Sequence, residues 1–259
     1  MTARAITSLA NPIVKAVRAL HMRKARQESG LFLVEGLKAV TEAVDLRRAP
    51  RILLYGEGVA NHPLLARAAA VAGETLEVSA AILAKISRRD NPQTVLGVFE
   101  QAFTDLGALD PAPARCWVAL EAVRDPGNLG TIVRTADAAG CGGVILVGDC
   151  CDPYSVEAVR ATMGSIFAVP IARTGVAEFL AWRARWPGSV VGTLLTAETD
   201  FRAAPYRDPT LILMGNEQAG LSASLAAACD VTVKIPMRGR ADSLNLAVAT
   251  GVMIYAATA

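Results

Sequence analysis

The sequence predicts an α/β protein with two domains, and three observations support this fold class. Short apolar runs alternate with helical segments along nearly the whole chain, which is typical of strand–helix alternation. The runs of the second half lack polar alternation, which suits a parallel sheet covered on both faces. A segment rich in Pro, Gly and Asp, residues 106–113, predicts a linker between domains at residues 1–105 and 114–259.

The first half is expected to begin with a helix over residues 11–27. Ile13, Val17 and Leu20 recur there at helical spacing and form a partial apolar stripe. Strands and helices then alternate, which predicts a small α/β domain. The strands are expected at residues 31–34, 51–55, 75–78 and 94–99, and the helices at 36–46, 62–72 and 80–86.

The second half repeats the alternation more strongly. Its strands are expected at residues 117–120, 143–147, 168–171, 189–195, 211–214 and 231–235. Its helices are expected at residues 128–139, 154–163, 175–186, 221–229 and 243–257. The uncharged run 244–259 is shorter than the roughly 20 residues of a membrane span. Because it also carries Asn245 and Thr250, it is expected to be a buried core helix and not a membrane anchor.

Composition and charge indicate a globular protein with one basic region. The hydrophobic fraction is 53% and the charged fraction 19%, which fits a soluble chain with a sizeable core. The net charge is only +2, but residues 1–51 hold ten Lys or Arg against four Asp or Glu. Such a basic region is expected of a protein that binds a phosphate backbone, although a solvated helix face explains it equally well.

Several common sites are missing from the sequence. There is no Walker A loop, no HExxH, and no GxGxxG after a strand. The two histidines, His21 and His62, both lie in the N-terminal half, which argues against a Ser-His-Asp hydrolase. His62 is expected at a helix start or on the surface.

Cysteine usage and the N-terminus indicate a cytoplasmic protein without a metal. The five cysteines form no CxxC pair and have mostly apolar neighbours, so we expect reduced, buried thiols. Lys15 and Arg18 interrupt the N-terminal apolar residues, so no signal peptide is expected.

Three segments of the second half are harder to explain as scaffold, and the first is residues 125–136. A turn rich in Pro and Gly opens a helix, and Arg134 follows Asn128 by six residues, about one and a half turns. With apolar neighbours, Arg134 is expected to be partly buried and to need a partner. The alternative is a surface arginine.

The second and third segments, residues 214–222 and 235–245, each follow a predicted strand. Segment 214–222 holds two glycines and Glu217, and glycines let the backbone approach a ligand closely. An ordinary turn followed by a helix that Ser222 caps is equally compatible with this segment. In segment 235–245, Asn245 opens an apolar helix, so its buried amide would need a backbone or ligand partner. Ser243 is an equally good helix cap.

Taken in order, the three segments resemble the SpoU/TrmH branch of the SPOUT methyltransferases, over roughly residues 116–259. The family pattern reads Asn-x-Gly-x-x-x-Arg, then Gly-x-Glu-x-x-Gly-Leu, then Ile-Pro-Met-x-Gly-x-x-x-Ser-Leu-Asn. The matching residues are Asn128, Gly130, Arg134, Gly215, Glu217, Gly220, Leu221, Ile235, Pro236, Met237, Gly239, Ser243, Leu244 and Asn245. Gln218 stands where glycine is common, and Leu246-Ala247 replaces a more usual Val-Ser.

The N-terminal region resembles the RNA substrate-binding domain, related to a ribosomal protein fold, that precedes the catalytic domain in several members. The resemblance lies in residues 6–8, 11–12, 15 and 32–36. Together with the basic charges, it gives candidate RNA contacts at Asn11, Lys15, Arg23, Lys24 and Arg26.

The resemblance implies a deep trefoil knot in the second domain, a feature nearly absent from other proteins. It also implies a homodimer whose active site forms across the two copies. The cofactor S-adenosylmethionine would lie bent among the knotted loops. Its implied binding residues are Thr193, Leu194, Gly215, Ile235, Met237, Ser243 and Leu244.

The implied reaction is 2′-O-methylation of RNA ribose, with Arg134, Asn128, Glu217 and Asn245 as catalytic residues. Arginine stays charged at neutral pH, so Arg134 is not expected to act as a simple base. We expect Arg134 instead to bind the RNA phosphate and to stabilise the developing alkoxide. Asn128, Glu217 and Asn245 would then orient Arg134 and the RNA.

The substrate leaves alternatives open. The extra basic domain favours ribosomal RNA over transfer RNA. The Asn-x-Gly-x-x-x-Arg segment favours ribose over a base. A non-catalytic RNA-binding protein of the same fold is a further alternative, against which the intact catalytic positions argue.

Overall fold

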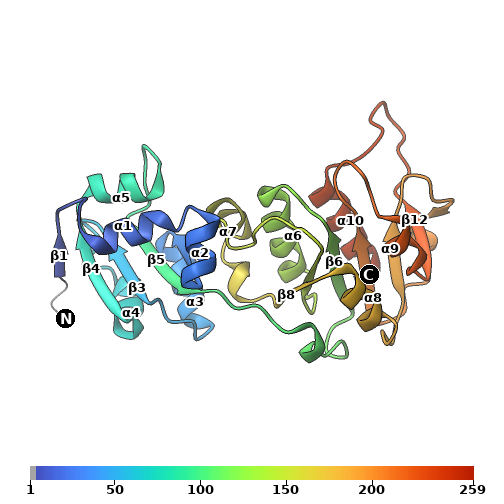
Figure 1. Cartoon of the computed structure of the whole chain (residues 1–259), viewed down its shortest axis with the longest axis horizontal. Helices are drawn as coiled ribbons and strands as arrows, with labels where there is room; N and C mark the ends of the chain where they lie inside the picture. Colours follow the sequence, from blue (N-terminus) through green and yellow to red (C-terminus); the bar gives the residue numbers. More distant parts are fainter. Residues whose placement is uncertain (1–3) are drawn as a thin grey trace. The chain divides into compact units, whose positions relative to one another are not determined.

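The structure is a computed structural model that describes residues 4–259, which form two compact units (Figure 1). The first unit contains the described residues up to Gln101 together with Asp152–Ala168. The second unit contains Ala102–Cys151 and Val169–Ala259. The first unit is therefore discontinuous in sequence. The proposed linker holds a 3-10 turn, Leu106–Ala108, and Leu106 belongs to the core of the second unit.

The first unit is an α/β fold around a five-stranded mixed sheet of order β1-β4-β3-β5-β2. Strand β4 is parallel to β1 and β3, and β5 is antiparallel to β2 and β3. The strands are β1 Arg4–Ile6, β2 Leu31–Glu35, β3 Ile52–Tyr55, β4 Glu74–Val78 and β5 Val95–Glu100. The helices are α1 Pro12–Ala19, α2 Arg23–Ser29, α3 Leu37–Asp45, α4 Pro63–Val71, α5 Ala80–Ser87 and α7 Val156–Thr162.

The single helix predicted over residues 11–27 is wrong, because the chain forms two helices there. Met22 has extended backbone angles, φ −92° and ψ 130°, and separates α1 from α2. The side chain of Arg26 donates to the carbonyl of Leu20 at 2.7 Å, so the end of α1 is held by a residue of α2. The apolar stripe that suggested one helix covers only the first of the two.

Arg26 and Asp152 form a buried ion pair that attaches the segment Asp152–Ala168 to the rest of the first unit. Nε and Nη2 of Arg26 lie 2.8 and 2.7 Å from Oδ2 of Asp152. Arg26 is 3% exposed and Asp152 9%. A pair this deep is costly to break from one side, because the remaining charge stays buried without a partner.

A second ion pair and an aromatic cluster hold the same segment. Arg160 donates to both carboxylate oxygens of Glu35, at 2.8 and 2.7 Å, and to the carbonyl of Ser87 at 3.0 Å. Tyr154 packs on Phe32 with ring centroids 4.7 Å apart. The segment therefore supplies part of the core of the first unit.

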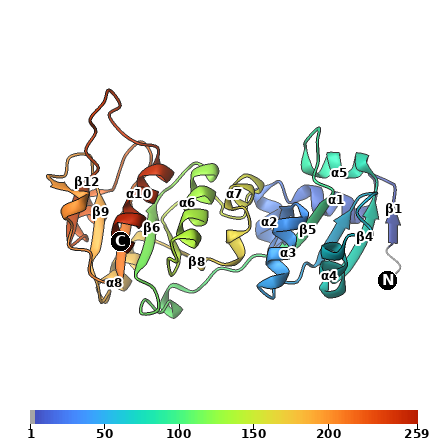
Figure 2. The same cartoon turned by 180° about the vertical axis from the view of Figure 1, so that it is seen from behind.

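The second unit is built on a seven-stranded sheet of order β10-β12-β9-β11-β6-β7-β8, in which every strand pair is parallel (Figure 2). The strands are β6 Cys116–Glu121, β7 Val144–Val147, β8 Ile171–Thr174, β9 Val190–Thr193, β10 Thr199–Asp200, β11 Thr210–Met214 and β12 Val231–Lys234. The helices are α6 Pro126–Ala138, α8 Val176–Arg183, α9 Ala223–Ala227 and α10 Leu246–Thr258. This confirms the α/β class and the parallel sheet; the knot stays a prediction.

The strand predicted at residues 168–171 is displaced, since β8 begins only at Ile171. Residues Ser165–Phe167 form a 3-10 turn, and Pro170 has no N–H to donate to a sheet. The carbonyl of Pro170 still accepts from the N–H of Val144 at 2.9 Å, so pairing starts directly after the proline.

Helix α10 is only partly buried, which corrects the expectation of a core helix. Thr250, Met253 and Ile254 are buried, but Val248 is 53% exposed and Tyr255 56%. One face of this apolar helix is therefore uncovered in the single chain. No helix within residues 4–259 combines the length and apolar character that a membrane crossing requires.

We predict that Asp152→Ala destabilises the protein by about 3–5 kcal/mol, because it leaves Arg26 charged, buried and unpaired. The control is Asp45→Ala, which removes the exposed ion pair with Arg67 and should cost less than about 1 kcal/mol. Urea unfolding followed by circular dichroism measures both free energies. Equal losses for the two variants would contradict the structural role assigned to the buried pair.

Candidate functional site

Three loops meet where β6, β11 and β12 end. They comprise residues 122–125, 215–222 and 235–245. Because parallel strands present their carboxyl ends at one edge of a sheet, this is the edge where open α/β folds bind ligands. The loops 215–222 and 235–245 carry two of the segments that the sequence singled out, and the loop 122–125 leads into the other, residues 125–136.

Glu217 connects the loop after β11 to the start of α6. Its carboxylate accepts from the backbone N–H groups of Arg124 and Asp125, both at 3.2 Å. It also accepts from the side-chain amide of Asn128 at 3.3 Å. Residues about ninety positions apart in the chain are thereby fixed relative to one another.

Asn128 and Asn245 extend this connection to the third loop. The amide of Asn245 donates to the side-chain oxygen of Asn128 at 2.9 Å. The oxygen of Asn245 accepts from the N–H groups of Ala247 and Val248 at 2.9 and 3.3 Å, so Asn245 caps α10. Ser243 is therefore not the cap, and Asn245 is exposed where a buried amide was expected.

The hydrogen bonds keep Glu217 in its charged form. Burial by itself would raise the pKa of Glu217. The N–H groups of Glu217 itself, Asp125 and Arg124, with the amide of Asn128, outweigh burial and hold the pKa below its usual value. The site therefore contains a carboxylate that stays ionised at neutral pH.

Two residues that sequence reasoning missed also shape the site. Asp125 caps α6 by accepting from the N–H of Asn128 at 2.6 Å, and an Asp-Pro pair before a helix was a usable signal. Asn216 donates to the carbonyl of Ala122 at 2.8 Å and accepts from the N–H groups of Gln218 and Ala219. Nothing in the sequence pattern distinguished Asn216 from a turn residue.

Gly215 is required by the fold of its own loop. Asn216 and Gly220 pair across the loop, and the backbone of Gly220 and Leu221 occupies the space a Cβ of Gly215 would need. The close backbone approach that the sequence suggested is therefore made by the chain itself. Ser222 caps the helix that follows, α9, as the simpler interpretation of this segment predicted.

A cavity of about 860 Å³ opens among the three loops, at the upper end of the range for small-molecule sites. All the residues expected to bind the cofactor line it, and Asn128, Glu217 and Asn245 do so as well. Its walls combine apolar side chains with hydroxyl and amide groups. The lining residues that the sequence assigned to the cofactor are Thr193, Leu194, Gly215, Ile235, Met237, Ser243 and Leu244.

Arg134 is separate from this cavity. It is exposed, which makes the expectation of partial burial wrong, and it does not line the cavity. Six residues of helix place it about 9 Å along α6 from Asn128 and about 120° around the axis. Arg134 therefore projects from a different side of α6 than Asn128 does.

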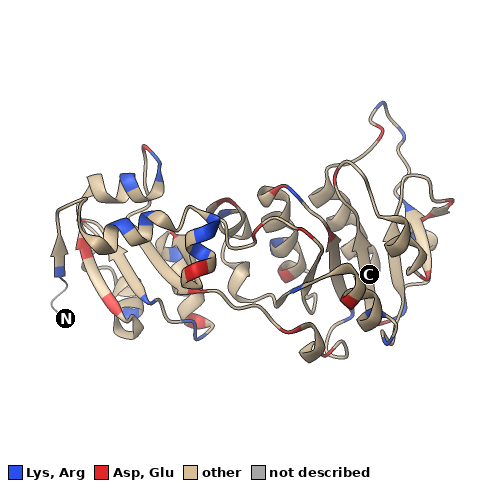
Figure 3. Cartoon of the chain, in the orientation of Figure 1, with Lys and Arg blue, Asp and Glu red and all other residues tan. Residues whose placement is uncertain are grey.

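The candidate RNA contacts of the first unit differ in whether their side chains are exposed or engaged within the unit. Lys15, Arg23 and Lys24 are exposed on α1 and α2, which carry Lys and Arg in Figure 3. Asn11 caps α1 by accepting from the N–H of Ile13 at 2.9 Å. The assignment of Arg26 to RNA is wrong, because its buried guanidinium pairs with Asp152 and donates to the carbonyl of Leu20 inside the unit.

Comparison with known families matches both halves of the chain. Residues 115–255 match the SpoU rRNA Methylase family, which is more than half of the sequence. Residues 11–97 match the MRM3-like substrate binding domain.

Relatives of similar length extend over nearly the whole chain. An AdoMet-bound rRNA methyltransferase from Sinorhizobium meliloti is 49% identical, with a TM-score of 0.92, covering 98% of this chain and 97% of that one. The 23S rRNA (uridine(2479)-2′-O)-methyltransferase of Streptomyces viridochromogenes is 34% identical, covering 98% and 92%. The 23S rRNA (guanosine(2553)-2′-O)-methyltransferase RlmP of Bacillus subtilis is 30% identical, covering 96% and 97%. The chain belongs to the SpoU rRNA methylase family.

Proposed function

We propose that this protein is an S-adenosylmethionine-dependent 2′-O-ribose methyltransferase that acts on ribosomal RNA. The observation that carries the proposal is the cavity whose rim is fixed by the hydrogen bonds from Glu217 through Asn128 to Asn245. Two relatives that match nearly the whole chain are named as 2′-O-methyltransferases of 23S rRNA.

The cavity suits S-adenosylmethionine in size and in chemistry. Leu194, Ile235 and Leu244 offer apolar surface for the two faces of an adenine ring. Thr193 and Ser243 offer hydroxyl groups for the polar parts of the molecule. When bound, S-adenosylmethionine supplies an electrophilic methyl group.

The chain's own residues position and activate the ribose hydroxyl. Asn128 and Asn245 present amide groups at the rim of the cavity, and aligning the hydroxyl with the methyl contributes several kcal/mol. Arg134 binds the RNA phosphate and stabilises the negative charge that develops on the 2′ oxygen. It acts as a positive charge and hydrogen-bond donor and not as a base, because arginine is charged at neutral pH.

The exposed position of Arg134 supports a homodimer in which it completes the site of the other copy. Val248, Val252 and Tyr255 recur at helical spacing on the uncovered face of α10. An apolar helix face of this kind is typical of an interface between copies. Helix α6, which carries Arg134, packs against α10, so we place the arginine close to this interface.

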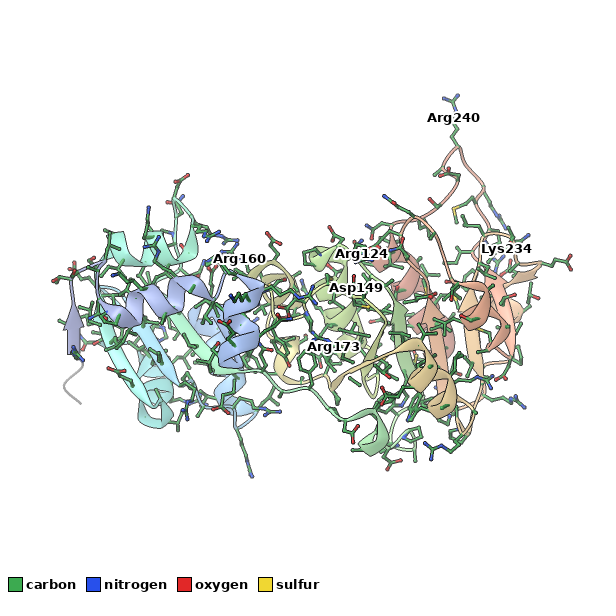
Figure 4. The ribbon with its side chains drawn as sticks, in the orientation of Figure 1. Arg124, Asp149, Arg160, Arg173, Lys234 and Arg240 are labelled. Carbon is green, nitrogen blue, oxygen red and sulfur yellow. The ribbon has the colours of Figure 1, made fainter. Side chains whose placement is uncertain are left out.

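The remaining implications of the resemblance belong to the same proposal. They are the deep trefoil knot, a cytoplasmic location, and methyl transfer without a metal. The exposed basic residues of α1 and α2 would bind the RNA backbone, and Arg240, at the tip of the loop 235–245, stands in position to do so as well (Figure 4).

Methyl transfer itself tests the proposed function. Purified protein with labelled S-adenosylmethionine and unmodified ribosomal RNA should yield 2′-O-methylnucleosides, detected by nuclease digestion and mass spectrometry. Leu244→Trp should fill the cavity and weaken cofactor binding at least about tenfold, measured by calorimetry. The control Leu46→Trp replaces an exposed leucine outside the cavity and should leave binding unchanged. A base-methylated product would contradict the proposed reaction.

The shared site is tested with Arg134→Ala. This variant should lose methyl transfer but keep cofactor affinity, because Arg134 lies outside the cavity. A mixed dimer of Arg134→Ala with Leu244→Trp, isolated through two different tags, should recover about half of the wild-type activity, because one complete site forms. Normal turnover by Arg134→Ala, or no recovery in the mixed dimer, would contradict action across the dimer.

The ionised Glu217 predicts a pH-dependent stability. Folding lowers the pKa of Glu217 from 4.5, the usual glutamate value. Its contribution to the free energy of unfolding is therefore complete at pH values above 4.5 and falls as the pH drops through the folded pKa. Glu217→Gln should therefore be less stable than wild type near about pH 7, with a gap that narrows in acid. Urea unfolding at several pH values measures the gap, and Glu198→Gln is the exposed control. A gap independent of pH would rule out the charge as its cause.

A further inference from the structure

A second cavity lies beside the cofactor cavity in the second unit. It measures about 640 Å³ and is formed by the turn after β6 and the loop after β11. The loop residues Asn216–Gly220 line both cavities. Among its lining residues, Glu217 had been assigned to the reaction and Ser222 to a helix cap from the sequence.

Glu121, the last residue of β6, places a buried carboxylate in this cavity. The residue is 9% exposed, and its Oε2 accepts from the N–H of Ser222 at 2.8 Å. Its Oε1 accepts no hydrogen bond from any residue between positions 4 and 259. A carboxylate oxygen accepts hydrogen bonds, so Oε1 offers a ligand in this cavity an acceptor that no protein donor occupies.

The neighbouring Glu217 does not offer a comparable acceptor. Its two oxygens already receive N–H groups from Arg124, Asp125 and Asn128. Of the three carboxylates that line this cavity, Asp125 is exposed and caps α6, so Glu121 is the buried one with capacity for a ligand. Ala122, which follows Glu121 with φ 49°, turns the chain around the cavity and is held by the amide of Asn216.

Arg124 adds a positive charge to the same cavity. Its Nη1 lies 2.8 Å from Oδ2 of Asp149, and the two side chains point toward each other in Figure 4. A guanidinium has five N–H donors, so this single ion pair leaves donors for an anion. The cavity thus combines one open acceptor with a cation beside it.

We propose that this cavity binds a nucleobase of the RNA at the methylation site. Glu121 Oε1 accepts a hydrogen bond from a ring or amino N–H of the base, and Arg124 binds the adjacent phosphate. Proteins read single-stranded RNA through the edges of unstacked bases, and carboxylates accept hydrogen bonds from base N–H groups. The inference rests on the proposed function and makes Glu121 a residue that selects and positions the RNA.

The variant Glu121→Gln tests the inference in the full-length protein. Its amide oxygen can still accept from the N–H of Ser222, while its NH₂ group faces the base with a donor in place of an acceptor. The substrate is 23S ribosomal RNA transcribed in vitro, which carries no modification. We expect kcat/KM for this RNA to fall about tenfold to a hundredfold, mainly through KM, with cofactor affinity and melting temperature unchanged.

The control Glu198→Gln changes an exposed glutamate that lines neither cavity and should leave all these quantities unchanged. Unchanged RNA kinetics in Glu121→Gln would overturn the inference. A parallel loss of cofactor affinity would also overturn it, because Glu121 would then act only by holding the shared loop. Absence of methyl transfer by the wild-type protein would instead refute the proposed function, so the two failures are distinguishable.

Discussion

The arrangement of the site depends on the hydrogen bonds accepted by one carboxylate, that of Glu217. Its carboxylate accepts from N–H groups at the start of α6 and from the amide of Asn128, and hydrogen bonds to a charged group are stronger than those between neutral groups. These bonds fix the orientation of the Asn128 amide, whose oxygen then accepts from Asn245. Asn245 in turn sets where α10 begins. Three loops that are distant in sequence thus reach one geometry through a single chain of hydrogen bonds.

Much of this architecture was accessible from the sequence, because apolar runs and glycine-rich turns are local signals. Six of the seven strands of the parallel sheet were placed within three residues of their observed bounds, while the two-residue strand β10 was not predicted. The motif residues around the cavity were identified. The errors lie where local patterns compete with tertiary structure. Pro170 delays β8, and the side chain of Arg26 holds the end of α1, neither of which hydrophobic periodicity reports. Asn216 escaped notice because a turn asparagine looks the same with or without a partner across the loop.

The role of Arg26 shows why charge alone does not assign a binding surface. Its position in a basic stretch suggested RNA, yet its partner Asp152 lies 126 residues further along the chain. A count of charges does not tell where a side chain points. No local pattern predicts that Asp152–Ala168 packs in the first unit. The same segment brings Arg160 to Glu35, so two arginines neutralise buried carboxylates there. Of the cations that the sequence assigned to RNA in the first unit, Lys15, Arg23 and Lys24 are the exposed ones.

The charge of the cofactor cavity gives a separate reason to look beyond one chain. Among its lining residues, all within 4–259, Glu217 and Asp242 are acidic and Lys234 is the one cation. A reaction that develops negative charge on a ribose oxygen is disfavoured beside carboxylates unless a positive group is brought close. Arg134 has the right chemistry, but the helix turns it away from Asn128. The same turn leaves it exposed on α6, a helix that packs against α10. Electrostatics and helix geometry therefore both favour the proposed homodimer, in which the other copy would supply an arginine to each cavity.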